Sequence, residues 1–276
     1  MLLALMVLLP VFAFAQEAEE SNVGEVIVRE GLAEIEDGPV GENAPFIPEG
    51  MLEDADEGDR AVIGADNRSS VNPSKYPYSA IAYMEVYGKC DCSWTATGFM
   101  VDKDWLMTAG HCLVCTQHQQ WADRITFYFG YRSRSDYLYR YNSQWTAWTD
   151  NTLFAGDNSY KDHDWGYVKL NKNVGDTTGW FGMRYGMADS EYDLEWFNVA
   201  GYRNGKIQTS VGHAEAYNSY RVLHYADTEP GYSGCPVFDN EYYAVAINTA
   251  HFTDGTANIG RRITSQLYHD MQSNGF

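Results

Sequence analysis

Three short segments of the chain carry the residue types that nucleophilic catalysis requires. Ser233 lies in the segment GYSGCP, His111 lies in TAGHC, and Asp164 directly precedes the apolar run WGYVKL. A serine hydroxyl attacks a carbonyl usefully only when an imidazole accepts its proton and a third group orients that imidazole. The set therefore predicts acyl transfer, with Ser233 as nucleophile, His111 as base and Asp164 as the orienting group.

Other histidines and aspartates compete for these roles. Asp162 is close to Asp164, but the strand-like run starts directly after Asp164 and favours it. His163 adjoins Asp164, but adjacent strand residues point to opposite faces, so His163 is not expected to be the base that Asp164 orients. The other histidines have no motif around them and are expected to be ordinary surface or core residues: His118, His213, His224, His251 and His269.

The glycine two residues before Ser233 predicts an oxyanion hole. Gly231 leaves the backbone free to turn, so that its N–H and the N–H of Ser233 can point at one oxygen. Each such donor contributes about 10²–10³ in rate in measured cases. The plain alternative is an ordinary turn between strands, which the histidine motif and the aspartate upstream disfavour.

The amino-terminal region indicates export and processing. Residues 1–15 are almost wholly apolar, end in Ala-Phe-Ala and are too short to span a bilayer, so they predict a secretory signal peptide. Residues 16–60 contain about 15 of the acidic residues and two arginines, in a chain of net charge −19. They predict a poorly packed pro-segment, or else an acidic tail that is never removed. No basic stripe is present, which argues against nucleic acid as a partner.

The chain contains 5 cysteines, and four of them bracket the histidine motif. In a secreted protein, Cys90, Cys92, Cys112 and Cys115 are expected to form two disulfides, with the pairing undecided. The same four residues can alternatively be interpreted as a zinc site, although the Cys90–Cys92 spacing is tight and His111 has a better use. Cys235 is left over and is expected to be buried and free.

Beyond Arg60 the chain alternates short apolar runs with turn residues, which predicts an all-β protein of the barrel or sandwich class. Only residues 264–271, near the end, have a helical pattern. Aromatic and basic residues interleave between residues 132 and 148. That pattern is compatible with a stacking surface for nucleic acid or sugar, but strands with one wet face explain it better.

A set of ordered segments resembles the glutamyl-endopeptidase branch of the chymotrypsin-like (bacterial trypsin-like) serine proteases over roughly residues 61–268. The matching segments are VIGADNR (62–68), YPYSAI (76–81), TGFMV (97–101), TAGHC (108–112), GWFG (179–182), GYSGCPVF (231–238) and NIGRRIT (258–264). The resemblance implies two six-stranded antiparallel β-barrels, at 61–175 and 176–276, with the triad between them. It also implies cleavage after Arg60 and a mature amino terminus at Ala61.

Departures from the family leave the cleavage specificity open. A histidine that binds the glutamate of substrates usually stands where this chain has Asn248, so a preference for glutamate is in doubt. Asp227 lies where trypsin has its arginine-binding aspartate, although glutamyl-specific relatives also carry Asp-Thr here. Tyr232 replaces the aspartate that captures the new amino terminus in trypsin-like zymogens. If the family geometry holds, Asp227, Thr228, Asn248 and the amine of Ala61 line the primary pocket.

These observations predict a secreted, monomeric serine endopeptidase made as a precursor, acting on proteins or peptides. It is expected to need no cofactor, to bind no metal and to have no membrane anchor. A catalytically silent binding protein on the same scaffold is the alternative from another class. A lipase or esterase is a third hypothesis, which the chain order His, Asp, Ser disfavours.

Overall fold

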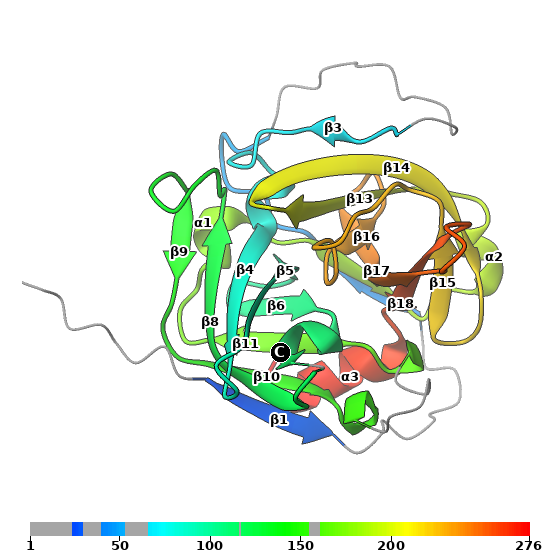
Figure 1. The fold of residues 1–276 in the computed structure, drawn as a ribbon. Coiled ribbons are helices and arrows are strands. Elements are labelled where there is room, and N and C mark those ends of the chain that lie inside the picture. The colour runs from blue at the N-terminus through cyan, green and yellow to red at the C-terminus, as the bar shows by residue number, and fades with distance from the viewer. Residues whose placement is uncertain (1–23, 30–39, 53–65, 116, 155–160) are drawn as a thin grey trace, which may run out of the picture.

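The computed structural model describes residues 24–29, 40–52, 66–115, 117–154 and 161–276. The expected signal peptide and the expected cleavage site after Arg60 lie outside these residues. Two curved β-sheets lie side by side, and the carboxyl-terminal helix runs beneath the first of them (Figure 1). Among the described residues, no helix combines the length and apolar character required to cross a bilayer.

The first sheet is a half-barrel in which strands follow the order β1-β10-β11-β6-β5-β4-β8-β7, with β9 paired to β8. β1 occupies the outer edge of β10 in parallel orientation, so the sheet does not close on itself. Its strands are β1 (Glu25–Arg29), β4 (Ile81–Gly88), β5 (Ser93–Met100), β6 (Trp105–Thr108), β7 (Val114–Cys115), β8 (Gln120–Phe129), β9 (Tyr139–Tyr141), β10 (Trp145–Asp150) and β11 (Gly166–Leu170).

The second sheet contains a closed ring of six strands, because β16 pairs with both β13 and β17. Three further strands, β2, β3 and β12, extend it at its edges. Its strands are β2 (Gly41–Asn43), β3 (Ser69–Ser70), β12 (Gly182–Tyr185), β13 (Trp196–Arg203), β14 (Lys206–Ala216), β15 (Arg221–His224), β16 (Pro236–Phe238), β17 (Tyr243–His251) and β18 (Asn258–Arg262).

The helices are few and short. They are η1 (Tyr78–Ala80), η2 (Gly110–Leu113), η3 (Asn151–Phe154), α1 (Gly175–Thr178), α2 (Asp189–Tyr192) and α3 (Ser265–Ser273). The side chain of Thr264 caps α3 by accepting a hydrogen bond from the N–H of Leu267. The predicted all-β fold of two barrel-like sheets with a carboxyl-terminal helix is therefore confirmed, with one ring closed and the other sheet a half-barrel.

The acidic region differs from the poorly packed segment that the sequence predicts. Residues 25–29 pair with β10, and residues 41–43 pair with β12. The side chain of Asn43 accepts a hydrogen bond from the N–H of Met183 and donates one to the carbonyl of Val101. Hydrogen bonds of the backbone and of Asn43 therefore order parts of this polar segment, although the segment has few apolar residues. Composition alone does not reveal such bonds.

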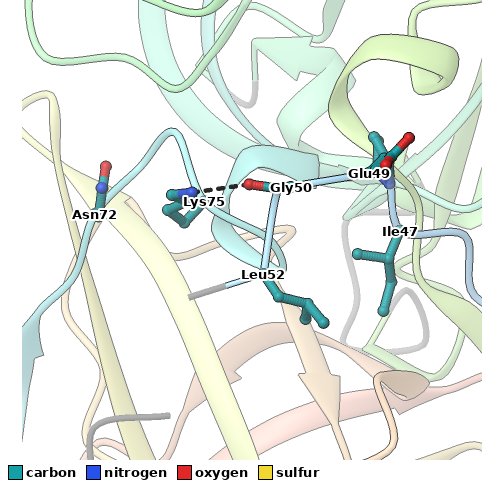
Figure 2. A pocket seen from close by; sticks show the side chains of 7 residues that line it. Ile47, Glu49, Gly50, Leu52, Asn72 and Lys75 are labelled. Atoms are coloured by element: carbon teal, nitrogen blue, oxygen red, sulfur yellow. Dashed lines mark hydrogen bonds between the residues drawn. The ribbon is translucent and has the colours of Figure 1, made fainter. Parts of the chain in front are cut away.

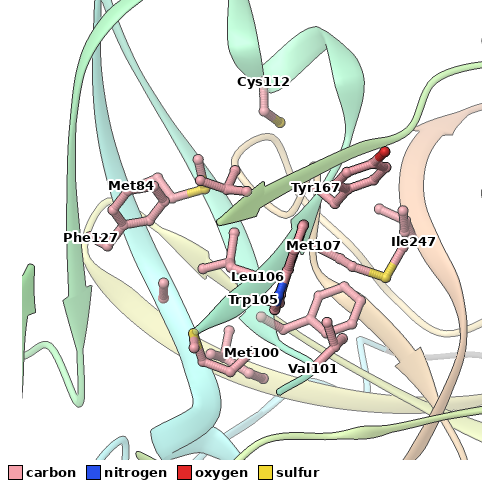
Figure 3. Packing of buried hydrophobic residues seen from close by; sticks show 14 of the residues in the cluster. Met84, Met100, Val101, Trp105, Leu106, Met107, Cys112, Phe127, Tyr167 and Ile247 are labelled. Atoms are coloured by element: carbon pink, nitrogen blue, oxygen red, sulfur yellow. The ribbon is translucent and has the colours of Figure 1, made fainter. Parts of the chain in front are cut away.

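The cores form because alternate strand residues point to one face and those residues are apolar. Figure 3 shows Met84 and Phe127 from neighbouring strands packed near Leu106, with Cys112 close by on η2. The interleaved aromatic region also contributes to this core, since Tyr141, Trp145 and Trp148 are buried. These strands with one buried face favour the structural interpretation of that region over a stacking surface.

Candidate active site

His111 and Asp164 lie together at the edge of the first sheet. The Nδ1 atom of His111 donates to Oδ2 of Asp164 over 2.7 Å, and the backbone N–H of His111 donates to Oδ1 over 2.8 Å. Asp164 is only 3% exposed and directly precedes Trp165 and β11, which pairs with the strand leading to His111. One carboxylate therefore fixes both the backbone and the ring of the histidine, and Nε2 faces away from Asp164, 3.8 Å from the sulfur of Cys112.

The electrostatics of this pair suit a general base. Burial by itself disfavours the imidazolium form, but the Asp164 carboxylate, with a smaller contribution from Cys112, outweighs it and holds the pKa of His111 well above its usual range. A carboxylate at 2.7 Å stabilises the charge that the ring acquires when it accepts a proton. The arrangement can therefore take a proton from a neighbouring hydroxyl and later return it.

The competing residues have other partners. Asp162 accepts a hydrogen bond from the side chain of Asn218 and forms an ion pair with Arg221 at 2.6 Å. His163 Nδ1 lies 3.7 Å from Asp150 Oδ2, and its ring packs at a tilt against that of Tyr220. Neither residue contacts the His111 ring, so the structure brings together Asp164 and His111 as the sequence predicts.

Ser233 lies where the two sheets meet. Its carbonyl accepts a hydrogen bond from the N–H of Thr97 on β5 over 3.0 Å and one from the thiol of Cys112 over 3.4 Å. Gly234 follows with a φ of +87°, and a Cβ there would meet Thr97 O at 2.1 Å and Thr108 Oγ1 at 2.2 Å. Only glycine allows this approach, which places the serine next to the residue that follows His111.

The two expected oxyanion-hole donors are available. In the described part of the chain, the N–H groups of Gly231 and Ser233 donate no hydrogen bond, whereas the intervening Tyr232 N–H donates to Glu229 O. Gly231 has a φ of +109°, and a Cβ there would meet Tyr202 O at 2.7 Å. The described residues contain no hydrogen bond between Ser233 and His111, whose Nε2 lies 3.8 Å from Cys112 Sγ.

Asp227 and Thr228, two of the expected pocket residues, are engaged with other parts of the chain. Asp227 Oδ2 accepts from the N–H of Asn67 over 2.8 Å, and Thr228 Oγ1 donates to Asn258 over 2.7 Å. Ala61, whose amine the resemblance places at the pocket, lies outside the described residues. The carboxylate of Asp227 thus binds the backbone shortly after the expected cleavage site.

Asn248 is 4% exposed and forms a dyad with His224, which is fully buried. Asn248 Nδ2 donates to the carbonyl of Tyr232, so its Oδ1 is the acceptor and His224 Nε2 must donate to it over 2.9 Å. Burial lowers the pKa of His224 to about 4, although Asn248 opposes this shift. The imidazole is therefore neutral at pH 7, and the dyad carries no charge.

The cysteines are arranged differently from the sequence prediction. All five are free thiols in the structure, so the two expected disulfides among Cys90, Cys92, Cys112 and Cys115 are absent. Cys112 points toward Ser233 instead, because its place in η2 turns it into the junction of the sheets. The other three cysteines, Cys90, Cys92 and Cys115, cluster instead with His118, whose Nδ1 lies 3.1 Å from Cys92 Sγ. Cys235 is buried and free, as expected.

A surface pocket lies apart from these residues. Figure 2 shows Ile47, Glu49, Gly50, Leu52, Asn72 and Lys75 around it, with Lys75 donating to the carbonyl of Gly50 over 2.9 Å. None of the candidate catalytic residues lines it. It lies between the acidic segment and the start of the first sheet, and we assign it no role in catalysis.

Sequence reasoning missed the partners that come from distant segments. His224 has no motif of its own, yet it orients Asn248, which is 24 residues away. Thr97 lies within one of the quoted segments but gave no sign that its N–H binds the carbonyl of Ser233. His118 follows Cys115 at a spacing typical of metal ligands, and this signal was present in the sequence.

Comparisons with known proteins find peptidases, and the family model covers more than half of the chain. A family model described as a trypsin-like peptidase domain matches residues 96–247, an interval that contains His111, Asp164 and Ser233. The chain is 29% identical over 228 residues to a protein of Bacillus subtilis (strain 168) named extracellular metalloprotease, covering 77% of this chain and 69% of that protein. It is 27% identical over 227 residues to the glutamyl endopeptidase of Bacillus licheniformis, covering 77% and 68%.

A solved structure shows the same fold. The structure of a Glu endopeptidase in complex with MPD superposes with a TM-score of 0.65 at 22% identity, covering 78% of this chain and 99% of that one.

Proposed function

The chain belongs to the trypsin-like peptidase family and is a serine endopeptidase, and from this premise we propose that it is a secreted enzyme made as a precursor. The resemblance to the glutamyl-endopeptidase branch of the chymotrypsin-like proteases is confirmed by the same comparisons. In our proposal Ser233 is the nucleophile, His111 is the base and Asp164 orients it. The observation that supports this most strongly is the double hydrogen bond from His111 to Asp164.

The proposed chemistry has two stages. Ser233 Oγ attacks the scissile carbonyl carbon while His111 Nε2 accepts the hydroxyl proton, which gives a tetrahedral oxyanion. Its collapse breaks the C–N bond, and the proton on His111 passes to the leaving amine. Water then attacks the acyl-enzyme ester, with His111 again as base, and releases the acid product and free Ser233.

The backbone supplies the electrostatic contribution. The unengaged N–H groups of Gly231 and Ser233 are the proposed donors to the oxyanion. Fixed donors of this kind stabilise charge that develops in the transition state and need no reorganisation. The carboxylate of Asp164 stabilises the imidazolium that forms at the same moment.

The proposal of secretion and maturation rests on the amino-terminal region and on the relatives. One relative is named an extracellular metalloprotease, and residues 1–15 have the pattern of a signal peptide. Cleavage after Arg60 would release Ala61, six residues before Asn67, whose N–H is held by Asp227. Arg68 forms ion pairs with Asp66 and Glu229, so the segment after the cleavage site is docked against the loop that carries Ser233.

We propose a primary pocket without a strong preference for glutamate. The neutral dyad of His224 and Asn248 supplies no positive charge, and a buried substrate carboxylate without a paired charge costs several kcal/mol. Arginine is also disfavoured, because the carboxylate of Asp227 already accepts a hydrogen bond from Asn67. Cleavage of a diverse peptide mixture tests this, and strict cleavage after glutamate or after arginine would contradict it.

The alternative from another class, a catalytically silent binding protein, is disfavoured by the family assignment. The observation that favours it is the absence of a hydrogen bond between Ser233 and His111 in the described residues. Such bonds are often long in enzymes without substrate and tighten on binding, so this observation alone does not exclude catalysis.

Labelling with a fluorophosphonate probe separates the two candidates. The mature wild-type protein is expected to react covalently at Ser233, and the Ser233→Ala variant is expected not to react. A folded mature protein that stays unlabelled would establish the binding-protein interpretation.

A further inference from the structure

Four metal-binding side chains converge outside the proposed catalytic residues. The sulfur atoms of Cys90, Cys92 and Cys115 and a ring nitrogen of His118 all lie within 4.8 Å of one another. His118 Nδ1 is 3.1 Å from Cys92 Sγ and 3.5 Å from Cys115 Sγ. These three thiols are not joined to one another, and the proposed peptidase chemistry uses none of them.

Two neighbouring hairpin turns supply the four side chains in pairs. Cys90 and Cys92 lie in the turn between β4 and β5, whereas Cys115 ends β7 and His118 lies in the turn between β7 and β8. Each turn contains a non-glycine residue in the left-handed region, Asp91 at φ 61° and Gln119 at φ 52°. Because strain of this kind costs energy, it persists only where the surroundings impose it. In both turns the left-handed residue lies next to a candidate ligand.

Strand pairing holds the two turns side by side. β4 pairs with β8 as far as the contact of Gly88 with Ala122, and the N–H of Lys89 donates to the carbonyl of Trp121. The two pairs of ligands are thus brought together by the sheet itself. The geometry does not depend on long flexible side chains reaching across a gap.

The donor set and spacing fit zinc. Three thiolates and one imidazole form a common structural zinc site, and a tetrahedral site with Zn–S bonds of about 2.3 Å places its ligand atoms about 3.7 Å apart. A disulfide would use two of the three cysteines and leave a thiol and the imidazole without a purpose. Four protein ligands also leave no open position for water, which is typical of structural and not catalytic zinc.

The location of the cluster suggests what the metal does. Cys115 ends β7, which follows directly after η2, the helix that carries His111. Trp94, two residues after Cys92, donates from Nε1 to the carbonyl of Cys112 over 2.8 Å. A metal ion held by both turns would therefore fix both the strand and the helix that position His111.

We propose that Cys90, Cys92, Cys115 and His118 form a structural zinc site that clamps the β4–β5 and β7–β8 turns. This replaces the expected disulfides and departs from the expectation that no metal is bound, while leaving the peptidase chemistry free of metal. The inference does not depend on the proposed catalytic roles, because the site is closed and lies outside the triad.

Metal analysis of the full chain tests this directly. We would express it with Ser233→Ala to prevent self-digestion, purify it without chelators, and measure zinc by mass spectrometry of the elements and of the native protein. We expect one zinc per chain and reactive thiols at these cysteines only after a chelator is added. Replacement of zinc by cobalt should give thiolate-to-metal charge-transfer absorption, a readout that does not require activity.

Matched variants assign the ligands. Cys92→Ser and His118→Asn should lower the bound zinc roughly tenfold or more. The exposed position of His118 makes the second variant the safer one for folding. His269→Asn, a histidine on α3 outside the cluster, should keep one zinc. A disulfide among these cysteines, free thiols without zinc, or zinc retained in both ligand variants would each overturn the proposal.

Discussion

Replacement of the buried His224 should flatten part of the pH dependence of stability. His224 is fully buried, and its pKa is lowered from 6.5 to about 4 in the folded protein because burial disfavours the imidazolium. Between these two pH values the unfolded chain binds a proton that the folded protein excludes. Stability is therefore fully present above pH 6.5 and is lost as the pH falls toward 4.

The size of this loss follows from the shift. Each unit of pKa difference corresponds to about 1.4 kcal/mol, so His224 should account for about 3 kcal/mol of destabilisation between neutral pH and pH 4. In His224→Gln, the amide nitrogen takes the place of Nε2 and still donates to Asn248, but it does not titrate. Because that hydrogen bond is kept, the stability of the variant near pH 7 should differ from that of the wild type by less than about 1 kcal/mol, the contribution of an ordinary hydrogen bond.

Urea denaturation at several pH values between 7 and 4 provides the measurement, with Ser233→Ala as the common background. The difference between the two proteins isolates His224 from other groups that titrate in this range. His213→Gln, at an exposed histidine, is the matched control and should keep the wild-type slope. Parallel curves for His224→Gln and the wild type would show that folding does not change the proton affinity of His224 and would refute its lowered pKa.

Three further predictions concern the proposed enzyme. Asp164→Asn should lower kcat by about 10⁴-fold with little change in KM, since the ring of His111 loses its orienting charge. A loss of kcat below about tenfold in steady-state kinetics would contradict this. Amino-terminal sequencing of active protein should give a start within two residues of Ala61, and full activity with a start at Gln16 would show that the acidic segment does not inhibit. Asn248→His should raise kcat/KM for glutamate over glutamine substrates by about tenfold or more, because an imidazolium can pair with the carboxylate; an unchanged ratio would remove Asn248 from the pocket.

The sequence by itself determined the fold class and the chemistry. Short apolar or alternating runs closed by turn residues specify strands, and the apolar runs at residues 236–238 and 105–108 are strands in the structure. The motifs around Ser233 and His111 also indicated the proposed nucleophile and base, since such residues require particular neighbours. Cys235 was expected to be buried and free, and it is.

Only the tertiary structure decided which residues meet across long stretches of chain. The acidic segment adds strands to both sheets because its backbone groups find partners there, a gain that composition cannot report. The predicted disulfides are absent because η2 turns Cys112 toward Ser233, while strand pairing brings His118 to the other three cysteines. The charge of the pocket depends on His224, which meets Asn248 through sheet register. Local pattern fixes local conformation, whereas contacts between distant residues depend on how strands pair, and no local signal encodes that pairing.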